Sequence, residues 1–319
     1  DAGQQLLGSV EWKVNLMNHS QPVVLVLGAT GRTGSHLVQL LEQDPGPDNL
    51  EIRVALRKPE QAHTFRERGI STVHLDLDNL ATYQSALQGV QRLFMITGYT
   101  VDMLSQGKNL TDAAKEAGVE YIVHVGTFHQ PGRPQTKLIR HYIWHQLIET
   151  YIATSGLAWT HLHPNAFMQN FFGAVQDGKL HMFFGHQRVG LVDCFDLARV
   201  AAAALREPNK HQAQRYFLSV EALTMTEAAQ ILSDELNQSI TYKPLPTFDL
   251  RKLPLGQTME PAYFECIVRQ MELLQAGQLP DFADVYDNIP QIIGQKPVTF
   301  REFVRNNQTS FAASEEKPL

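Results

Sequence analysis

The stretch that decides the fold is VVLVLGATGRTGSHLVQLL, residues 23–41. It opens with five apolar residues, 23–27, which are typical of a strand buried on both faces of a parallel sheet. The glycines Gly28, Gly31 and Gly34 follow at GxxGxxG spacing, and a helical pattern then begins near Ser35. Glycine lets the backbone turn tightly and approach a pyrophosphate, while the helix N-terminus offers unpaired N–H groups. This strand–loop–helix context predicts a dinucleotide-binding loop in preference to a turn that needs glycine only for packing.

Strand and helix signals keep alternating outward from this loop. We expect further strands, with helices between them, at residues 52–56, 72–75, 92–96, 121–125 and 159–163. The alternation predicts an α/β fold with a doubly wound parallel sheet of the Rossmann type. After Pro164 the pattern changes to aromatic loops, a helix near 196–205, a strand near 216–220 and capping boxes at Thr224 and Thr299. We therefore expect a dinucleotide-binding Rossmann domain over 20–165 and a smaller mixed α/β C-terminal lobe over 166–319, interleaved with the sheet.

Composition narrows the class of protein. The 319 residues are 43% hydrophobic and 19% charged, as in an ordinary globular protein, and a net charge of −6 argues against a nucleic-acid partner. No apolar run approaches the ~18 residues of a membrane span. Cys194 and Cys266 form no disulfide or metal motif, so a cytoplasmic location is expected. Residues 1–19 lack a signal-peptide pattern, and we expect them to be a vector-derived or disordered leader.

The end of the second strand indicates which dinucleotide fits. A free ribose 2′-hydroxyl calls for an acidic residue there, but the sequence reads IRVALRKPE over 52–60. Arg57 and Lys58 stand where the acid would be, and Arg32 in the glycine loop adds a third cation. Guanidinium and ammonium groups suit a 2′-phosphate, so the sequence favours NADP(H) over NAD(H). The alternative is that Arg57 and Lys58 form a solvated strand end.

Four segments together resemble the NmrA-like group of atypical short-chain dehydrogenases/reductases, over about residues 22–307: GATGRTG, VALRKPE, residues 74–97 and residues 155–171. That group contains NADPH-dependent quinone, azo-dye and phenylpropanoid reductases, and also regulators that bind the dinucleotide without reducing anything. The resemblance implies adenine contacts at Asp76 and Leu77 and ribose or nicotinamide contacts along two further loops. The full set of expected cofactor contacts is Gly28, Thr30, Gly31, Arg32, Thr33, Gly34, Arg57, Lys58, Asp76, Leu77, Thr97, Gly98, Gly126, Thr127, Phe128, His145, Pro164, Asn165 and Phe167.

The catalytic signal is weaker than the binding signal. No tyrosine is followed four residues later by lysine, so the Tyr-x-x-x-Lys pair of typical short-chain dehydrogenases is absent. In many NmrA-like reductases the long helix resembles the pattern H-x-x-x-K-x-x-x-E. The same positions here hold His141, His145 and Glu149, so His145 stands at the lysine position. These residues share one helical face. By analogy His145 is the candidate catalytic residue, as a cofactor contact or general acid, and the alternative is a histidine that only packs and hydrogen-bonds.

Other chemistries find less support. His141 with His145, and His161 with His163, have spacings compatible with metal ligands, but HExxH and cysteine clusters are absent, so no metal site is expected. No G-x-S-x-G serine-hydrolase motif occurs. The aromatic residues of 166–172 and 182–184 suit either core packing or an apolar wall for a flat substrate.

The sequence thus predicts an NADPH-dependent oxidoreductase that transfers hydride to a small, flat, electrophilic substrate of quinone, imine, enone or azo type. Hydride transfer to an acceptor that is already electrophilic, such as a quinone or an iminium ion, does not require a protein acid. The expected substrate pocket comprises Phe128, His141, Phe167 and Asn170. The alternative is a non-catalytic regulator that senses NADP(H) and acts through a protein partner. A small-molecule substrate is the expected partner, and a homo-oligomer is compatible with the sequence.

Overall fold

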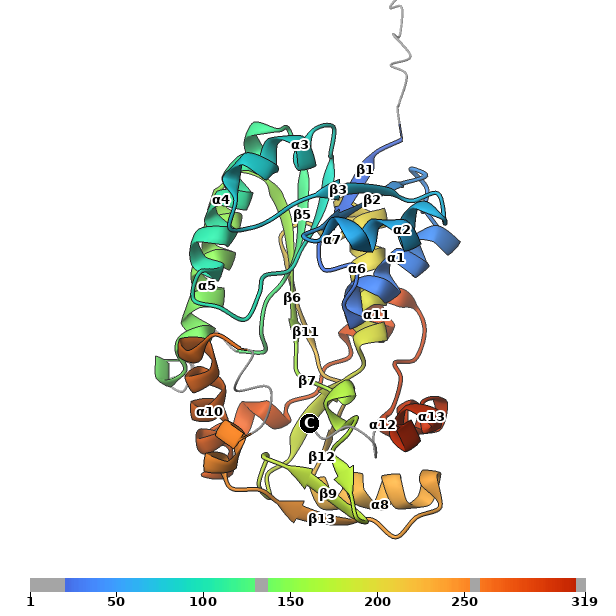
Figure 1. The fold of residues 1–319 in the computed structure, drawn as a ribbon, viewed down its shortest axis with the longest axis vertical. Helices are drawn as coiled ribbons and strands as arrows, with labels where there is room; N and C mark the ends of the chain where they lie inside the picture. The colour runs from blue at the N-terminus through green and yellow to red at the C-terminus, as the bar shows by residue number, and fades with distance from the viewer. Residues whose placement is uncertain (1–20, 130–136, 253–258, 314–319) are drawn as a thin grey trace, which may run out of the picture.

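A parallel sheet of seven strands forms the centre of the molecule (Figure 1). The computed structural model describes residues 21–129, 137–252 and 259–313, so the expected leader lies outside the described residues. The strand order is β11-β6-β5-β4-β1-β2-β3, and every neighbouring pair is parallel. The strands are β1 (Val23–Val26), β2 (Glu51–Leu56), β3 (Ser71–His74), β4 (Arg92–Met95), β5 (Tyr121–Val125), β6 (Ala158–Pro164) and β11 (Gln214–Leu218).

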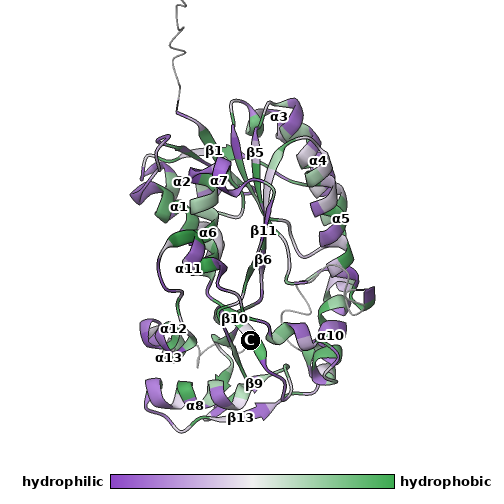
Figure 2. Ribbon diagram, turned by 180° about the vertical axis from the view of Figure 1, so that it is seen from behind, coloured by the Kyte–Doolittle hydropathy of each residue, from purple (hydrophilic) through white to green (hydrophobic). Residues whose placement is uncertain are grey.

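Helices cover both faces of this sheet. On one face α1 (Arg32–Gln43) packs against α6 (Cys194–Arg206), and on the other α4 (Met103–Glu116) packs against α5 (Arg140–Thr154) (Figure 1). Side chains of a strand alternate between faces, so Val24 and Val26 of β1 join the core with α1 and α6, while Leu25 joins the core with α4 and α5. This explains the uninterrupted apolar run: every side chain of β1 is buried. Figure 2 shows hydrophobic colour along the central strands and α6.

Shorter helices complete the sheet domain. They are α2 (Ala62–Arg66), α3 (Tyr83–Leu87), α7 (Pro208–His211) and α11 (Asn288–Ile293). The expected doubly wound parallel sheet is confirmed. Its seventh strand, β11, is the strand expected near 216–220, and it pairs with β6. Together with α6, it shows that residues beyond 165 contribute to the main sheet and its helical layer.

The remaining chain forms a smaller mixed lobe beside the carboxyl end of the sheet (Figure 1). Its two three-stranded sheets contain β7 (Ala166–Phe167), β10 (Val189–Val192) and β12 (Glu221–Leu223), and β8 (Val175–Gln176), β9 (Lys179–Met182) and β13 (Thr241–Pro244). The longer helices are α8 (Met225–Leu236), α10 (Pro261–Gln275), α12 (Phe300–Asn306) and α13 (Gln308–Ala313). Both expected capping boxes are confirmed, because Thr224 with Glu227 and Thr299 with Glu302 each exchange side-chain and backbone hydrogen bonds.

Most of the aromatic stretch that follows β6 packs in the core of this lobe. Met168 and Phe171 are fully buried, and Met182, Phe183 and Phe184 are nearly so. These side chains share one cluster with residues of α8, α10 and α12. Core packing therefore accounts for them, and of the stretch after β6 only residues 165–167 and 170 line a cavity at the carboxyl end of the sheet. Within the described ranges no helix has the length and apolar character needed to cross a membrane.

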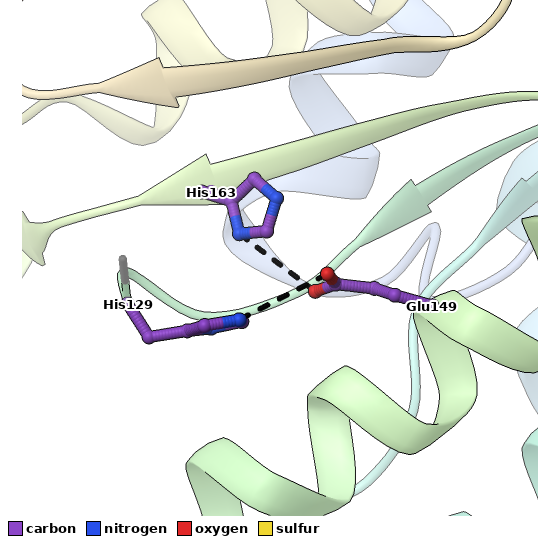
Figure 3. Close-up of side chains that lie close together, drawn as sticks. All are labelled: His129, Glu149 and His163. Carbon is purple, nitrogen blue, oxygen red and sulfur yellow. Dashed lines mark ion pairs between the residues drawn. The ribbon is translucent and has the colours of Figure 1, made fainter. Parts of the chain in front are cut away.

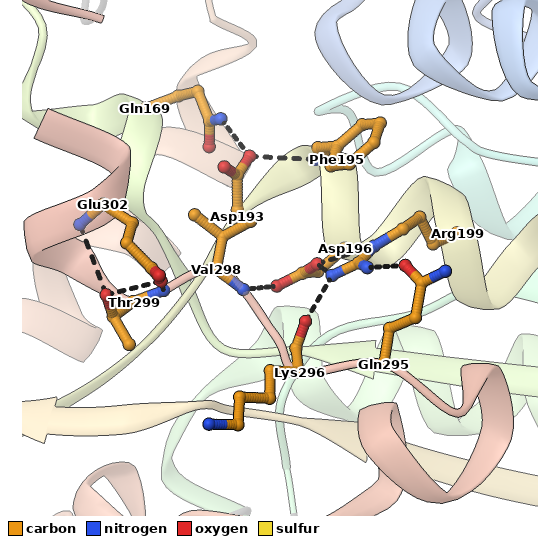
Figure 4. A network of polar contacts seen from close by, with 10 residues as sticks. All are labelled: Gln169, Asp193, Phe195, Asp196, Arg199, Gln295, Lys296, Val298, Thr299 and Glu302. Atoms are coloured by element: carbon orange, nitrogen blue, oxygen red, sulfur yellow. Dashed lines mark hydrogen bonds and ion pairs between the residues drawn. The ribbon is translucent and has the colours of Figure 1, made fainter. Parts of the chain in front are cut away.

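A polar network anchors the N-terminus of α6 to the C-terminal part of the chain (Figure 4). The Gln169 side chain donates to Asp193 Oδ1 over 2.6 Å, and the same oxygen caps the first turn of α6. One turn later the buried Asp196 carboxylate pairs with Arg199 and accepts a 2.8 Å hydrogen bond from the Val298 backbone. A buried carboxylate is tolerated when it is paired and hydrogen-bonded in this way. The network holds α6, and with it the floor of the adjacent cavity, in a fixed position.

Candidate active site

The glycine loop has the shape that its sequence predicts. Gly28 has φ +66°, a conformation that side chains other than glycine's rarely adopt. A Cβ on Gly34 would lie 2.2 Å from the Gly28 carbonyl oxygen, so the loop closes only with glycine at this position. Gly31 is the N-cap of α1, and no side chain caps this helix. The first N–H groups of α1 are therefore available to an anion, together with the positive end of the helix dipole.

Two cavities of about 530 and 690 Å³ meet at this loop. They share Gly28 and the residues after β4, Ile96–Tyr99, so they adjoin each other, and together they are called the groove below. The groove crosses the carboxyl ends of β1 and β4, where the strand order reverses direction. In doubly wound sheets this switch point is where ligands bind.

All the residues predicted for the site line this groove, although they come from segments far apart in the chain. The smaller cavity contains Gly28, Gly31, Arg32, Thr33, Gly34, Thr97, Gly98, Gly126, Thr127, Phe128, His141, His145, Pro164, Asn165, Phe167 and Asn170. The larger contains Gly28, Thr30, Arg57, Lys58, Asp76, Leu77, Thr97 and Gly98. The structure thus brings the predicted residues together; their roles remain predictions.

The three predicted cations are not gathered at one point. Arg57 and Lys58 are exposed at the larger cavity, and neither side chain has an ion pair or hydrogen bond within the described residues. Arg32 lines only the smaller cavity, where it donates a 3.3 Å hydrogen bond to the Gln169 carbonyl and lies 5.8 Å from the Phe172 ring centre. Arg57 and Lys58 are therefore placed to meet one anionic group, and Arg32 to meet a second.

His145 lies on α5 and lines the smaller cavity. Its side chain is buried, and its Nδ1 atom has no hydrogen-bond partner in the described part of the chain. Burial, with the nearby His124 and His141, holds its pKa well below the usual value, so the imidazole is uncharged at neutral pH. Burial likewise lowers the pKa of His141 to about 3. A neutral imidazole can exchange hydrogen bonds with a ligand, but it cannot replace the fixed charge of a lysine.

Glu149, one helical turn further along α5, is buried and does not line the groove. Burial raises its pKa to about 8, so the carboxyl is mostly protonated at neutral pH. His129, from the loop after β5, and His163 of β6 face its carboxyl group. Further buried histidines have ring contacts with one another: His124 of β5 with His145 of α5 and His161 of β6, and His145 with His141. The members of this group come from segments far apart in the sequence and meet only in the folded chain, so the group was not predicted.

One wall of the smaller cavity comes from α10 and was not predicted from the sequence. Tyr263, Ile267 and Gln270 of that helix, with Phe282 and Tyr99, also line the smaller cavity. The Tyr263 ring centre lies 5.5 Å from that of Tyr99 and 5.4 Å from that of His141. Tyr263, Ile267 and Gln270 are spaced by three or four residues along α10, which is an ordinary helical pattern. Only the folded structure shows that this face of the helix lies toward the smaller cavity.

Two predicted site residues also have structural contacts. The Asn165 amide donates to Ser219 Oγ over 3.3 Å and to the Phe282 carbonyl over 3.1 Å, which ties the end of β6 to two other segments. Phe128 is buried and packs edge-on against Phe217 and Phe282, with ring centres 5.9 and 6.2 Å away. Both residues therefore shape the cavity as well as facing it.

These features fit a dinucleotide. The glycine cradle has no room for a Cβ at Gly34, the α1 N-terminus has no side-chain cap, and two exposed cations lack partners within the described residues. A pyrophosphate would lie at the glycine cradle, beside Arg32, and a ribose phosphate at Arg57 and Lys58. Beside His145 the smaller cavity is lined by Tyr99, Phe167, Tyr263 and Phe282, which together form the aromatic chamber. This chamber leaves space for a second molecule.

Comparison with known proteins agrees with this geometry. Residues 20–303 match the NmrA-like family. The chain is 30% identical over 299 residues to an NAD(P)H azoreductase of Xenophilus azovorans, covering 92% of this chain and all of that protein. It is 28% identical over 235 residues to quinone oxidoreductase 2 of Escherichia coli, covering 71% of this chain and 79% of the relative. The structure of Citrobacter sp. triphenylmethane reductase complexed with NADP(H) shares the fold, with a TM-score of 0.75 at 24% identity over 89% of this chain and 99% of that one. The chain belongs to the NmrA-like family of NAD(P)-binding Rossmann proteins.

Proposed function

We propose that this protein is an NADPH-dependent oxidoreductase that reduces a small, flat, electrophilic organic molecule. The observation that carries the proposal is the groove at the sheet's switch point, with an aromatic chamber at one end and, at the other, Arg57 and Lys58, which have no partner among the described residues. The groove offers both a cofactor cleft and room for a reaction partner. Relatives named as an azoreductase and a quinone oxidoreductase support the reaction class.

Each end of the groove has a distinct task. The uncapped N-terminus of α1 and the glycine cradle bind the pyrophosphate, and Arg32 adds a guanidinium beside them. Arg57 and Lys58 bind the 2′-phosphate and so favour NADPH over NADH. When bound, the nicotinamide supplies a hydride. His145 exchanges a hydrogen bond with the ribose or the carboxamide, and the loop 126–128 closes the side of the ring pocket.

The protonation state of the two histidines in the chamber points to the kind of substrate. Burial lowers the pKa of both His141 and His145, so neither imidazole is protonated near neutral pH and neither is a cationic proton donor. Reduction of an ordinary ketone needs a proton donor at the developing alkoxide, whereas hydride addition to a quinone gives a stabilised phenolate and addition to an iminium ion gives a neutral amine. Tyr99, Tyr263, Phe167 and Phe282 provide aromatic surface that suits a flat molecule.

A direct assay tests the proposal. Purified protein would be mixed with NADPH and a panel of quinones, azo dyes, imines and enones, and NADPH oxidation would be followed by absorbance. We expect turnover with at least one class of acceptor and none with simple ketones. Tight NADPH binding with no turnover across the panel, and an affinity that depends on the redox state of the dinucleotide, would instead identify a sensor that acts through a protein partner.

A further inference from the structure

Three buried side chains meet behind the loop that follows β5, and none of them lines the groove (Figure 3). His129 comes from the turn after β5, Glu149 from α5 and His163 from β6. Their exposed fractions are 2%, 3% and 0%. Two imidazoles and one carboxyl group that face each other away from solvent are a rare arrangement, because buried polar groups normally have hydrogen-bond partners.

We propose that His129, Glu149 and His163 form a binding site for one divalent transition-metal ion, with Zn²⁺ as the best-suited ion. Two imidazole nitrogens and one carboxylate are a ligand set that Zn²⁺ and neighbouring first-row ions accept. The proposal is independent of the assigned reaction, because it concerns a site outside the groove.

The distances suit such a site. His129 Nε2 lies 3.9 Å from Glu149 Oε2, and His163 Nδ1 lies 3.7 Å from Glu149 Oε1. One ligand atom from each residue falls within 4.8 Å of the others. Bonds of about 2.0–2.2 Å to Zn²⁺ bring tetrahedral ligands to roughly 3.5 Å from each other. Small side-chain rotations would close that difference, and the fourth position is left to water.

The hydrogen bonds around the cluster leave two of the three proposed ligand atoms unpaired within the described residues. His129 Nδ1 lies 3.0 Å from the Thr127 carbonyl, so Nδ1 carries the proton and Nε2 keeps a lone pair. That Nε2 atom and Glu149 Oε1 are both buried without a partner in the described part of the chain. An imidazole oriented by a backbone carbonyl through its other nitrogen is the usual arrangement of a metal-bound histidine. One cation would satisfy both unpaired atoms.

Protons balance in a simple way. His163 Nδ1 is also 3.0 Å from the Thr127 carbonyl, so binding a metal through Nδ1 breaks that hydrogen bond and moves the ring proton to Nε2. Glu149 binds as the carboxylate and releases its proton to solvent. The Thr127 carbonyl keeps the hydrogen bond from His129, and this residue lines the groove. The ion would therefore brace the loop 126–129 against α5 and β6.

A cobalt titration tests the site. The protein would be stripped with a chelator, dialysed and titrated with Co²⁺, whose visible spectrum reports its coordination, and then with Zn²⁺ as competitor. We expect saturation at one equivalent, displacement by Zn²⁺, and a rise in the unfolding temperature of the stripped protein on loading. Glu149→Gln and His129→Gln should each weaken Co²⁺ binding by roughly 100-fold.

His161→Gln is the matched control, because it removes another buried imidazole from β6 that lies outside the triad. It should leave Co²⁺ affinity within about twofold of the starting protein. Circular dichroism would verify that each variant folds. If the stripped unmodified protein shows no saturable Co²⁺ or Zn²⁺ binding, the proposal is overturned whatever the variants do. Unchanged binding in folded Glu149→Gln would overturn it as well.

Discussion

Gly126 and Glu149 fit together so closely that a Cβ on Gly126 would lie 2.5 Å from Glu149 Oε1. The first residue lines the cofactor groove, and the second is buried behind it. The contact therefore couples the loop after β5 to the hidden cluster of histidines on α5 and β6. A glycine at this position reflects the size of a neighbouring carboxyl group, because φ at Gly126 does not fall in the left-handed region.

Gly126→Ala should consequently lower the free energy of unfolding by about 1–3 kcal/mol, as overpacking of a filled interior does. The cost should shrink in a Glu149→Ala background, where the opposing carboxyl is gone. A double-mutant cycle from urea unfolding measures this coupling. Equal costs in both backgrounds would show that the two residues do not meet as described.

The second prediction concerns Gly34 in the phosphate loop. Gly34→Ala places a methyl group against the Gly28 carbonyl, which belongs to backbone and cannot rotate away. We expect NADPH affinity to fall at least about tenfold, equivalent to 1.4 kcal/mol. Calorimetric titration would measure it, with Ser35→Ala as control because the Ser35 side chain is exposed and bonds only to the Arg32 carbonyl. An alanine variant that binds NADPH normally would contradict the tight cradle.

The third prediction concerns the choice of dinucleotide. Arg57→Ala removes a guanidinium that lacks a partner within the described residues, so the folded protein should be as stable as before. The loss of a charge-assisted hydrogen bond to a phosphate should cost about 1.5–3 kcal/mol of NADPH binding, or roughly 10- to 100-fold. NADH affinity should stay unchanged, and so should the unfolding temperature. A variant that still prefers NADPH to the same degree would assign selectivity to other residues.

The fourth prediction follows from the neutral state of His145. Because burial keeps its pKa well below the usual value, it does not titrate near neutral pH. The rate of hydride transfer, measured in single turnover, should therefore be flat between about pH 6 and pH 8. His145→Gln should keep part of the cofactor affinity, since glutamine also exchanges hydrogen bonds. A rate that titrates near the usual histidine pKa, and loses that titration in His145→Gln, would establish a general acid.

The fifth prediction concerns acid stability of the chelator-treated protein. Burial lowers the pKa of His161 to about 3, and that of His124 falls well below the usual value. Below the histidine pKa of about 6.5 the unfolded chain binds protons at these groups and the folded chain does not, so the free energy of unfolding decreases as pH falls. Each such histidine lowers the free energy of unfolding by about 1.4 kcal/mol per pH unit.

Glu149 acts in the opposite direction. Its folded pKa of about 8 exceeds the unfolded value, so it destabilises the fold progressively as pH rises toward 8. Stability should therefore peak near neutral pH and fall steeply in acid. Urea unfolding over a pH series checks this, and His124→Gln should reduce the acid slope by about one proton. An acid limb with the same slope in that variant would mean that His124 is protonated in the folded protein.

The phosphate loop and the doubly wound parallel sheet were predictable from local patterns. A buried parallel strand needs an apolar run, a phosphate loop needs glycine at fixed steps, and helix starts carry capping boxes; each is a property of fewer than about twenty neighbouring residues. The place of Arg57 at the groove was also predictable, because a dinucleotide's ribose is met at the end of the second strand, whereas Asp76 and Thr97 were expected from the resemblance to the NmrA-like family. The aromatic residues around 168–172 illustrate the limit, since a buried side chain and a pocket wall have the same composition.

The sequence alone determined the strand–loop–helix unit, the doubly wound sheet and a position for a dinucleotide, because these depend on backbone requirements that single residues report. The tertiary structure decided which side chains face one another. It separated Arg32 from Arg57 and Lys58, brought Tyr263 and Gln270 of α10 to the cavity beside His145, and buried His145 in its neutral form. It also gathered His129, Glu149 and His163 from a turn, a helix and a strand. Burial and proximity across distant segments set charge states and coordination geometry, and neither quantity exists until the chain has folded.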